Sequence, residues 1–100
     1  MPKTLIATFA PGPNWAHGKT SREQAHWPEH AVFMDALFAE GVVVMGGPYA
    51  DYSGVHLVVE ADSENAVPEL FKPDPFMING ILTLNSVKEW LVFLDVRRRN

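Results

Sequence analysis

The sequence predicts one α+β domain in which two helices cover one face of a four-stranded antiparallel sheet. Three observations support this fold class. The chain has 100 residues, of which 47% are hydrophobic and 20% charged, the length and composition of a single globular domain. Apolar runs with strand and helix periodicity follow one another in the order strand, helix, strand, strand, helix, strand. Most of these runs end at a proline or glycine, which interrupts regular structure.

The first strand and the loop after it are defined by composition. Residues 4 to 10 (TLIATFA) are apolar and β-branched, which is typical of a strand, and Pro11-Gly12-Pro13 ends it. Residues 14 to 20 form a loop. Two capping boxes, Thr20 with Glu23 and Ser21 with Gln24, then indicate the start of helical structure.

The first helix continues to Glu40. Pro28 indicates either that the main helix begins near this residue or that an earlier turn is kinked there. His30, Phe33 and Leu37 are spaced to form one stripe along the helix. Gly41 suits the position directly after a helix, because glycine adopts the left-handed conformation found there.

Two strands follow. Residues 42 to 45 are an uninterrupted apolar run, which predicts a strand ended by a turn at Gly46-Gly47-Pro48, and residues 49 to 54 are predicted to continue that turn. Residues 55 to 60 alternate, which predicts a strand with one face better buried.

A second helix is predicted to begin at Ser63 and to end before Pro73. Ile81 to Leu94 reads as a long final strand, bulged near Asn85-Ser86. The resulting order is βαββαβ, the ferredoxin-like arrangement.

The second face of the predicted sheet has no helix to cover it. Leu5, Ala7 and Phe9 point to one face and Ile6 to the other, so both faces look apolar. A bare apolar face would exceed the patches that monomers usually expose. The sequence therefore predicts a homodimer that forms through the sheet face.

Charge and composition exclude several classes of partner. The net charge is −4, and the only basic run is Arg97-Arg98-Arg99. We expect a domain over residues 1–96, a solvated basic tail over 97–100, and no nucleic-acid partner. Cysteine is absent, and no apolar run is long enough for a signal peptide or a membrane span. We therefore expect a cytoplasmic protein with no membrane partner.

The topology brings three segments to one end of the domain: the first half of the first helix, the Gly-Gly-Pro turn and the segment KPDPF. His30 and Asp74 would meet there as an acid–base pair, with the carboxylate orienting the imidazole. The prolines on both sides of Asp74 would limit the entropy lost in holding it. Two structural alternatives stay open: Asp74 caps a short helix, and His30 is a structural residue on an apolar face.

Other candidates at this end are binding residues. Trp27, Gly47, Pro48 and Phe76 are expected to contact a substrate. His26 and His30 have the spacing of helical metal ligands, but Pro28 lies between them and no third ligand is evident. We predict no metal site and no organic cofactor.

The segments HAVFMDALFAEGVVVMGGP, VVEADSENA, DPF and VKEWLVFLD resemble the YCII-related (YciI-like) domain family, from about Trp27 to Asp95. That family is similar in fold to the dimeric α+β barrel proteins, which include muconolactone isomerases and monooxygenases. The resemblance implies dimers with pockets between sheet and helices. His30 and Asp74 match the family's characteristic histidine and aspartate, which are regarded as its active-site pair.

Two functions follow as hypotheses. The first is an enzyme with lyase- or isomerase-like chemistry on a small, partly apolar compound, cyclic compounds included. The second is a non-catalytic dimeric module that binds a metabolite or serves as an accessory protein. The loop at residues 11–26 does not match the family pattern, so its role in specificity is open.

Overall fold

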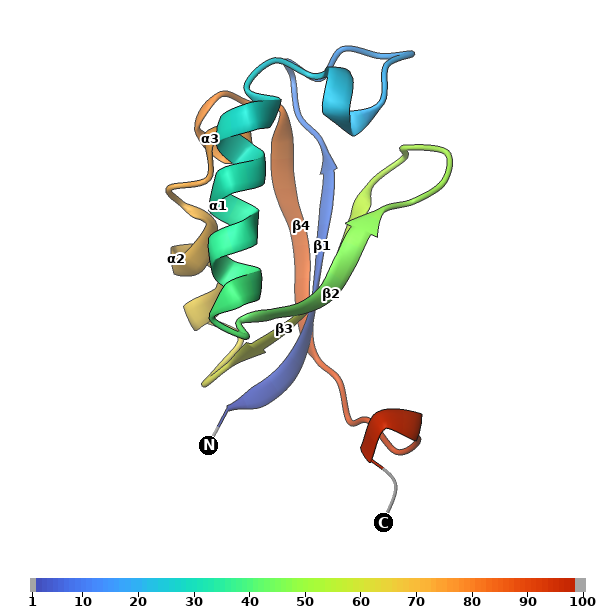
Figure 1. Cartoon of the computed structure of the whole chain (residues 1–100), viewed down its shortest axis with the longest axis vertical. Helices are drawn as coiled ribbons and strands as arrows, with labels where there is room; N and C mark the ends of the chain where they lie inside the picture. The colour runs from blue at the N-terminus through green and yellow to red at the C-terminus, as the bar shows by residue number, and fades with distance from the viewer. Residues whose placement is uncertain (1, 99–100) are drawn as a thin grey trace.

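A four-stranded antiparallel sheet with helices on one face makes up the computed structural model, which describes residues 2–98 (Figure 1). The strand order is β2-β3-β1-β4, with antiparallel pairing throughout. This order confirms the predicted ferredoxin-like α+β fold. The elements are β1 (Lys3–Pro11), η1 (Ser21–Glu23), α1 (Trp27–Ala39), β2 (Val43–Pro48), β3 (Val55–Ala61), α2 (Ala66–Phe71), α3 (Pro75–Ile78), β4 (Leu82–Glu89) and η2 (Val96–Arg98).

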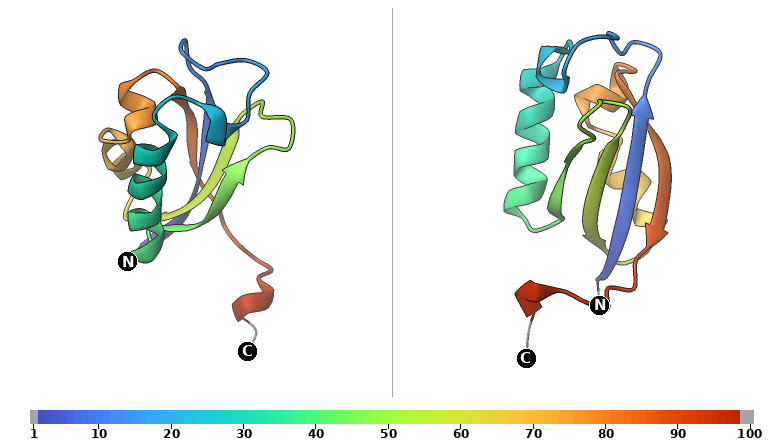
Figure 2. Two further views of the ribbon diagram at one scale, coloured as in Figure 1. Left: turned by 45° about the horizontal axis from the view of Figure 1, so that its top comes forward. Right: turned by 90° about the vertical axis from the view of Figure 1, so that its right-hand side faces the viewer.

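The hydrophobic core lies between the sheet and the helices (Figure 2). Alternate residues of the central strand β1, namely Leu5, Ala7 and Phe9, point into it and are buried. The ring of Phe9 packs edge-on against Phe71 of α2, with ring centroids 5.2 Å apart. Phe71 is fully buried, so this contact joins sheet and helices at the centre of the domain.

Helix α1 begins and ends at the predicted signals. Pro28 is its second residue, where a missing backbone N–H costs no helical hydrogen bond. His26, just before the helix, is left-handed with a φ of 68°, and this conformation separates η1 from α1. Gly41 follows the helix with a φ of 78°, which a residue with a side chain rarely adopts.

The predicted turn at Gly46-Gly47-Pro48 is wrong, because these residues belong to β2. Gly47 pairs with His56 and Pro48 with Val55 of β3. A proline is tolerated here because β2 is an edge strand, so its missing N–H breaks no second ladder. The turn predicted over residues 49 to 54 is confirmed, and a hydrogen bond from the Tyr49 N–H to the Gly54 carbonyl closes it.

The second helix ends before Pro73, as predicted, but it begins at Ala66 rather than at Ser63. The KPDPF segment forms a separate short helix, α3, which is the alternative that the sequence left open for Asp74. The break between the two has a local cause: Pro75 disfavours helical conformation in Asp74 before it, and Asp74 is extended with a ψ of 124°. The short helix α3 therefore joins the two predicted helices on this face of the sheet.

The final strand is shorter than predicted. Strand β4 ends at Glu89 rather than Leu94, and the register shift opposite Thr8 and Phe9 confirms the bulge at Asn85. Beyond Glu89, the Trp90 N–H still donates a backbone hydrogen bond to the Thr4 carbonyl of β1. Because β1 begins at Lys3, it has almost no backbone left to pair with later residues. Residues 90–96, hereafter the C-terminal arm, leave the sheet.

The uncovered sheet face, hereafter the outer face, is more polar than predicted. Its side chains include Thr8, His56 and Lys88 beside Ile6 and Val58. The prediction of an apolar outer face is therefore wrong. The most exposed large apolar side chains gather in the arm instead, where Phe93 and Leu94 are 90% and 92% exposed. Dimerisation through the sheet face stays a prediction.

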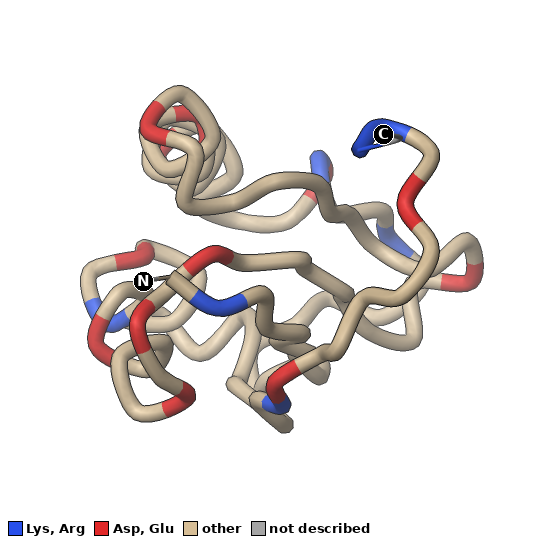
Figure 3. Tube along the Cα trace, turned by 90° about the horizontal axis from the view of Figure 1, so that it is seen from below, with Lys and Arg blue, Asp and Glu red and all other residues tan. Residues whose placement is uncertain are grey.

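Charged residues are dispersed over the domain (Figure 3). Arg97 forms an ion pair with Asp95 at 3.0 Å, and Arg98 lies 3.4 Å from Glu60 of β3. The rest of the predicted basic tail, Arg99 and Asn100, lies outside the described residues. Among residues 2–98, no helix has the length and apolar character needed to cross a membrane.

Candidate active site

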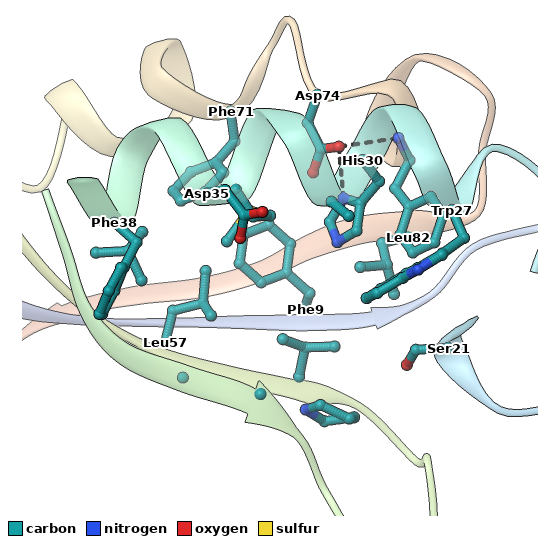
Figure 4. Close-up of a pocket in the computed structure, with 18 of the residues that line it drawn as sticks. Phe9, Ser21, Trp27, His30, Asp35, Phe38, Leu57, Phe71, Asp74 and Leu82 are labelled. Atoms are coloured by element: carbon teal, nitrogen blue, oxygen red, sulfur yellow. Dashed lines mark hydrogen bonds and ion pairs between the residues drawn. The ribbon is translucent and has the colours of Figure 1, made fainter. Parts of the chain in front are cut away.

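The structure brings His30 and Asp74, 44 positions apart in the sequence, into direct contact. His30 Nδ1 donates a hydrogen bond to Asp74 Oδ1 over 2.7 Å (Figure 4). The His30 side chain is 12% exposed and that of Asp74 only 2%. A charge-assisted hydrogen bond shielded from water in this way fixes the orientation of the imidazole.

Helix α3 places the carboxylate. Asp74 is the N-cap of this helix, and its Oδ1 also accepts a hydrogen bond from the Phe76 N–H over 3.0 Å. Pro75 occupies the first helical position, as expected for an Asp-Pro helix start. The capping role and the contact with His30, which the sequence left as alternatives, therefore both occur. The same oxygen of Asp74 caps the helix and contacts His30.

Aromatic side chains hold the imidazole plane. The His30 ring stacks on Phe76, with centroids 3.8 Å apart and planes inclined by 6°. Trp27, one turn earlier on α1, lies 5.5 Å from the imidazole and 6.2 Å from Phe76. With Nδ1 bound to Asp74 and one ring face against Phe76, His30 has little rotational freedom.

The second imidazole nitrogen, Nε2, faces a cavity. It makes no hydrogen bond to any residue in the range 2–98. Within that same range, no fully buried side-chain nitrogen or oxygen lacks a hydrogen-bond partner. Because Nε2 has no partner, it is not fully buried. A carboxylate accepts hydrogen bonds, and in a neutral imidazole whose Nδ1 is the donor to it, Nε2 is the acceptor nitrogen.

The cavity lies between α1 and the sheet and has a volume of about 810 Å³. Apolar side chains from all four strands and from the helices form most of its wall, among them Phe9, Met34, Val43, Leu57, Phe71 and Leu82. His30 and Asp74 stand at one end of it (Figure 4). Such a chamber suits a small molecule with an apolar body and few polar groups.

All four predicted binding residues line this cavity. Trp27 and Phe76 lie beside His30, while Gly47 and Pro48 contribute from β2 across the chamber. Gly46, also in the wall, is required for packing, since a Cβ there would stand 2.3 Å from a methyl group of Leu57. A Cβ on Gly47 would meet no atom within 4 Å, so packing does not require a glycine at this position.

Sequence reasoning missed two charged residues of the cavity wall, Asp35 and Arg22. Asp35 follows Trp27 and Ala31 at intervals of four along α1, which places all three on one helix face. That spacing could have revealed it, but the prediction followed the neighbouring stripe that ends at Leu37. Arg22 belongs to η1, and no local sequence pattern indicates that η1 lies beside the cavity in space.

The loop that the sequence could not match closes the end of the cavity beside η1. Gln24 holds it together: its Oε1 accepts from the Ala16 N–H over 2.7 Å, and its Nε2 donates to the Ala16 carbonyl over 2.9 Å. Thr20 and Ser21 then line the cavity. The hydrogen bond that Glu23 accepts from the Thr20 backbone lowers the pKa of Glu23 and stabilises the turn.

The other end of this loop is joined to the β4 side of the sheet. The Gly12 N–H donates to the Ile81 carbonyl over 2.8 Å, and the Asn14 N–H donates to the Gly80 carbonyl over 2.9 Å. A Cβ on Gly12 would stand 2.3 Å from the Gly80 carbonyl oxygen, so only glycine permits this approach. The loop is thus fixed at both ends rather than free.

The side chains of the described residues are not arranged as a metal centre. Among residues 2–98, no three His, Asp or Glu side chains converge as ligands. His26 instead lies 3.5 Å from Glu29, so it is turned toward its own helix.

Comparison with known proteins shows the family to which the chain belongs. The model of the YCII-related domain matches residues 4–91. An uncharacterized protein of Bacillus subtilis (strain 168), YjpA, is 39% identical over 67 residues, which cover 67% of this chain and 78% of that protein. No solved structure matches the chain. The family match spans both His30 and Asp74 and most of the chain, and this protein therefore belongs to the YCII-related domain family.

Proposed function

We propose that this protein is an enzyme in which His30 moves a proton on a small, partly apolar compound and Asp74 orients and stabilises His30. One observation carries the proposal: Nδ1 of His30 is bound to a buried carboxylate at 2.7 Å, while Nε2 opens onto a cavity. This arrangement gives one ring nitrogen a structural partner and leaves the other for chemistry.

The proton transfer runs through Nε2. The neutral imidazole removes a proton from a C–H or O–H group of the bound compound and becomes an imidazolium. The Asp74 carboxylate, 2.7 Å from Nδ1, stabilises the positive charge that forms. In an isomerisation, the imidazolium returns the proton to a different atom. In an elimination, the electron pair of the broken C–H bond forms a double bond, and a leaving group departs with its own bonding pair.

The residues of the cavity wall indicate a class of substrate but do not identify a single compound. An apolar chamber of about 810 Å³ favours a small molecule with a hydrophobic body, and a ring would fill it with little loss of conformational entropy. Arg22 and Asp35 are positioned to contact polar substituents away from His30. Lyase- or isomerase-like chemistry on small cyclic compounds fits this wall.

Proton abstraction can be tested before the natural substrate is known. A panel of small lactones, cyclic ketones and halogenated cyclic compounds is incubated with the protein in D₂O, and loss of C–H signals is followed by NMR. We expect hydrogen exchange or turnover with at least one compound. His30→Gln and Asp74→Asn should reduce its rate by about 100-fold or more, since general acid–base catalysis contributes roughly 10²–10⁴-fold.

Two outcomes would contradict the proposal. If both variants react at rates within a few-fold of that of the unmodified protein, His30 and Asp74 take no part in the proton transfer. Compounds that bind in the cavity without exchange or turnover would favour the non-catalytic module. Binding is measured separately by ligand-observed NMR, with Phe76→Leu as the control that alters the cavity wall but leaves both ionisable groups.

A further inference from the structure

The part of the cavity wall formed by η1 carries a cationic side chain without a partner. Arg22 is the one lysine or arginine among the wall residues in the range 2–98. Within that range its guanidinium forms no ion pair, whereas Arg97 and Arg98 each lie against a carboxylate. The adjacent carboxylate of Glu23 accepts from the Thr20 backbone instead. The Arg22 guanidinium can therefore bind an anion that enters the cavity.

Ser21, the residue before Arg22, supplies a second and independent observation. It is only 9% exposed, and Figure 4 shows its hydroxyl oxygen turned toward the chamber. Within residues 2–98 no fully buried side-chain oxygen lacks a hydrogen-bond partner. The Ser21 hydroxyl has no partner there, so it is not fully buried. Because enclosed polar groups normally form hydrogen bonds, the partner of this hydroxyl comes from the cavity.

The charged groups of the wall lie on opposite sides of His30. Figure 4 shows His30 between Asp35 and Ser21 along the chamber. Helix α1 explains this order, because each residue advances the helix by about 1.5 Å, which places Asp35 about 7.5 Å beyond His30 along the axis. Ser21 and Arg22 precede the helix, at its other end. The cavity thus has a cation on one side of the proton-accepting nitrogen and an anion on the other.

Asp35 restricts how an anionic compound can lie in this cavity. A compound with one negative group is attracted toward Arg22 and repelled from Asp35, so it binds in a single orientation. A compound with negative groups at both ends would place one of them toward the Asp35 carboxylate. Repulsion of that kind selects against the wrong ligand. The wall therefore favours a compound with one negative charge.

We propose that the substrate is a small monocarboxylic acid with an apolar body, whose carboxylate is bound by the Arg22 guanidinium and the Ser21 hydroxyl. Arginine donates two parallel hydrogen bonds to a carboxylate, and the hydroxyl donates a third. The body then extends along the apolar wall and brings a C–H bond to Nε2 of His30. This inference rests on the proposed function for the reaction and adds to it the class of compound that reacts.

The first experiment compares two probes that share one body, cyclohexanecarboxylate and the neutral cyclohexanecarboxamide. Their dissociation constants at neutral pH are obtained by NMR titration, followed at the Trp27 indole N–H. We expect the carboxylate to bind at least about tenfold more tightly, as charge-assisted hydrogen bonds are stronger than neutral ones. The same preference is expected in His30→Gln, which shows that a protonated imidazole is not what holds the anion.

The second experiment assigns the contact to individual side chains. Arg22→Gln should weaken carboxylate binding by about tenfold or more, and Arg22→Lys by less, because lysine keeps the charge but loses the planar fork. Ser21→Ala should weaken it several-fold. The matched control is Lys19→Gln, which removes a cation of the same loop that does not line the cavity. This control should change the affinity by less than about twofold.

The third experiment tests the role of Asp35. The probe trans-cyclohexane-1,4-dicarboxylate carries a second negative group at the far end of the same ring. We expect it to bind at least about tenfold more weakly than the monocarboxylate, and Asp35→Asn should remove most of this difference because it removes the like charge. Urea unfolding checks that every variant is folded.

Several results would overturn the inference. They are equal affinity for carboxylate and amide, equal weakening by Lys19→Gln, and loss of the preference in His30→Gln. Failure of the proposed function gives a different pattern: carboxylates bind through Arg22 but show no hydrogen exchange or turnover. Conversely, exchange of neutral compounds alone, with no effect of Arg22→Gln, would refute this inference and leave the proposed proton transfer in place.

Discussion

Replacing Asp74 with alanine removes two hydrogen bonds at once. The Asp74 Oδ1 atom accepts from the Phe76 N–H, which caps α3, and from His30 Nδ1, which orients the ring. Both bonds lie in a region where water has little access, since Asp74 is 2% exposed. Alanine offers no acceptor for either donor, and the side chain it leaves behind is too short to fill the space.

The expected loss of stability can be worked out from these two bonds. Losing the helix cap costs about 1 kcal/mol. Leaving the His30 donor without its partner in a nearly buried position costs a further ~1–3 kcal/mol. We therefore expect Asp74→Ala to lower the free energy of unfolding by roughly 2–4 kcal/mol, or the melting temperature by roughly 10–30 °C for a domain of this size.

Asp74→Asn is the matched variant. Its amide oxygen can accept both hydrogen bonds but carries no charge, so the cost should be less than half that of alanine. Urea unfolding at neutral pH, followed by circular dichroism, measures both variants. A double-mutant cycle with His30→Ala should give a coupling free energy on the order of 1–3 kcal/mol between positions 30 and 74.

Three results would refute this reasoning. The Asp74→Ala protein could be as stable as the unmodified chain. Asp74→Asn could lower the free energy of unfolding as much as Asp74→Ala does, or the coupling free energy between positions 30 and 74 could be zero. Asparagine should instead separate the two roles of the residue, with the fold nearly intact and proton transfer strongly reduced. An Asp74→Asn protein that is both stable and fully active would leave Asp74 with the capping role alone.

Two further predictions concern the loop that closes the cavity. Gly12→Ala should cost ~2 kcal/mol or more, because its Cβ would stand 2.3 Å from the Gly80 carbonyl oxygen, whereas Gly47→Ala, with no atom within 4 Å, should change the urea midpoint little; equal midpoints for the two variants would contradict the packing at Gly12. Gln24→Ala removes both side-chain hydrogen bonds to Ala16, so amide exchange in residues 16–20 should accelerate about tenfold while that of β1 stays unchanged. Unchanged exchange in the loop would mean that Gln24 does not hold it.

The sequence by itself determined the class of fold and most element boundaries near proline and glycine. Pro28 and Gly41 define α1 because the limits they set on backbone conformation are local. It also predicted that residues 30 and 74 would meet, since strand order fixes which loops share an end of the sheet. That prediction rests on topology and on the resemblance to the YCII-related family. The family match confirms the resemblance.

Only the tertiary structure decided how far each strand extends and what each face carries. The apolar pattern continues past Glu89 to Leu94, but β1 supplies no backbone beyond Lys3 for those residues to pair with, so the strand becomes an arm. Strand pairing requires a partner in space, and no local pattern reports where the partner begins. The same limit applies to Arg22 and Asp35: a charged side chain lines a cavity only when another element, distant in sequence, forms the opposite wall.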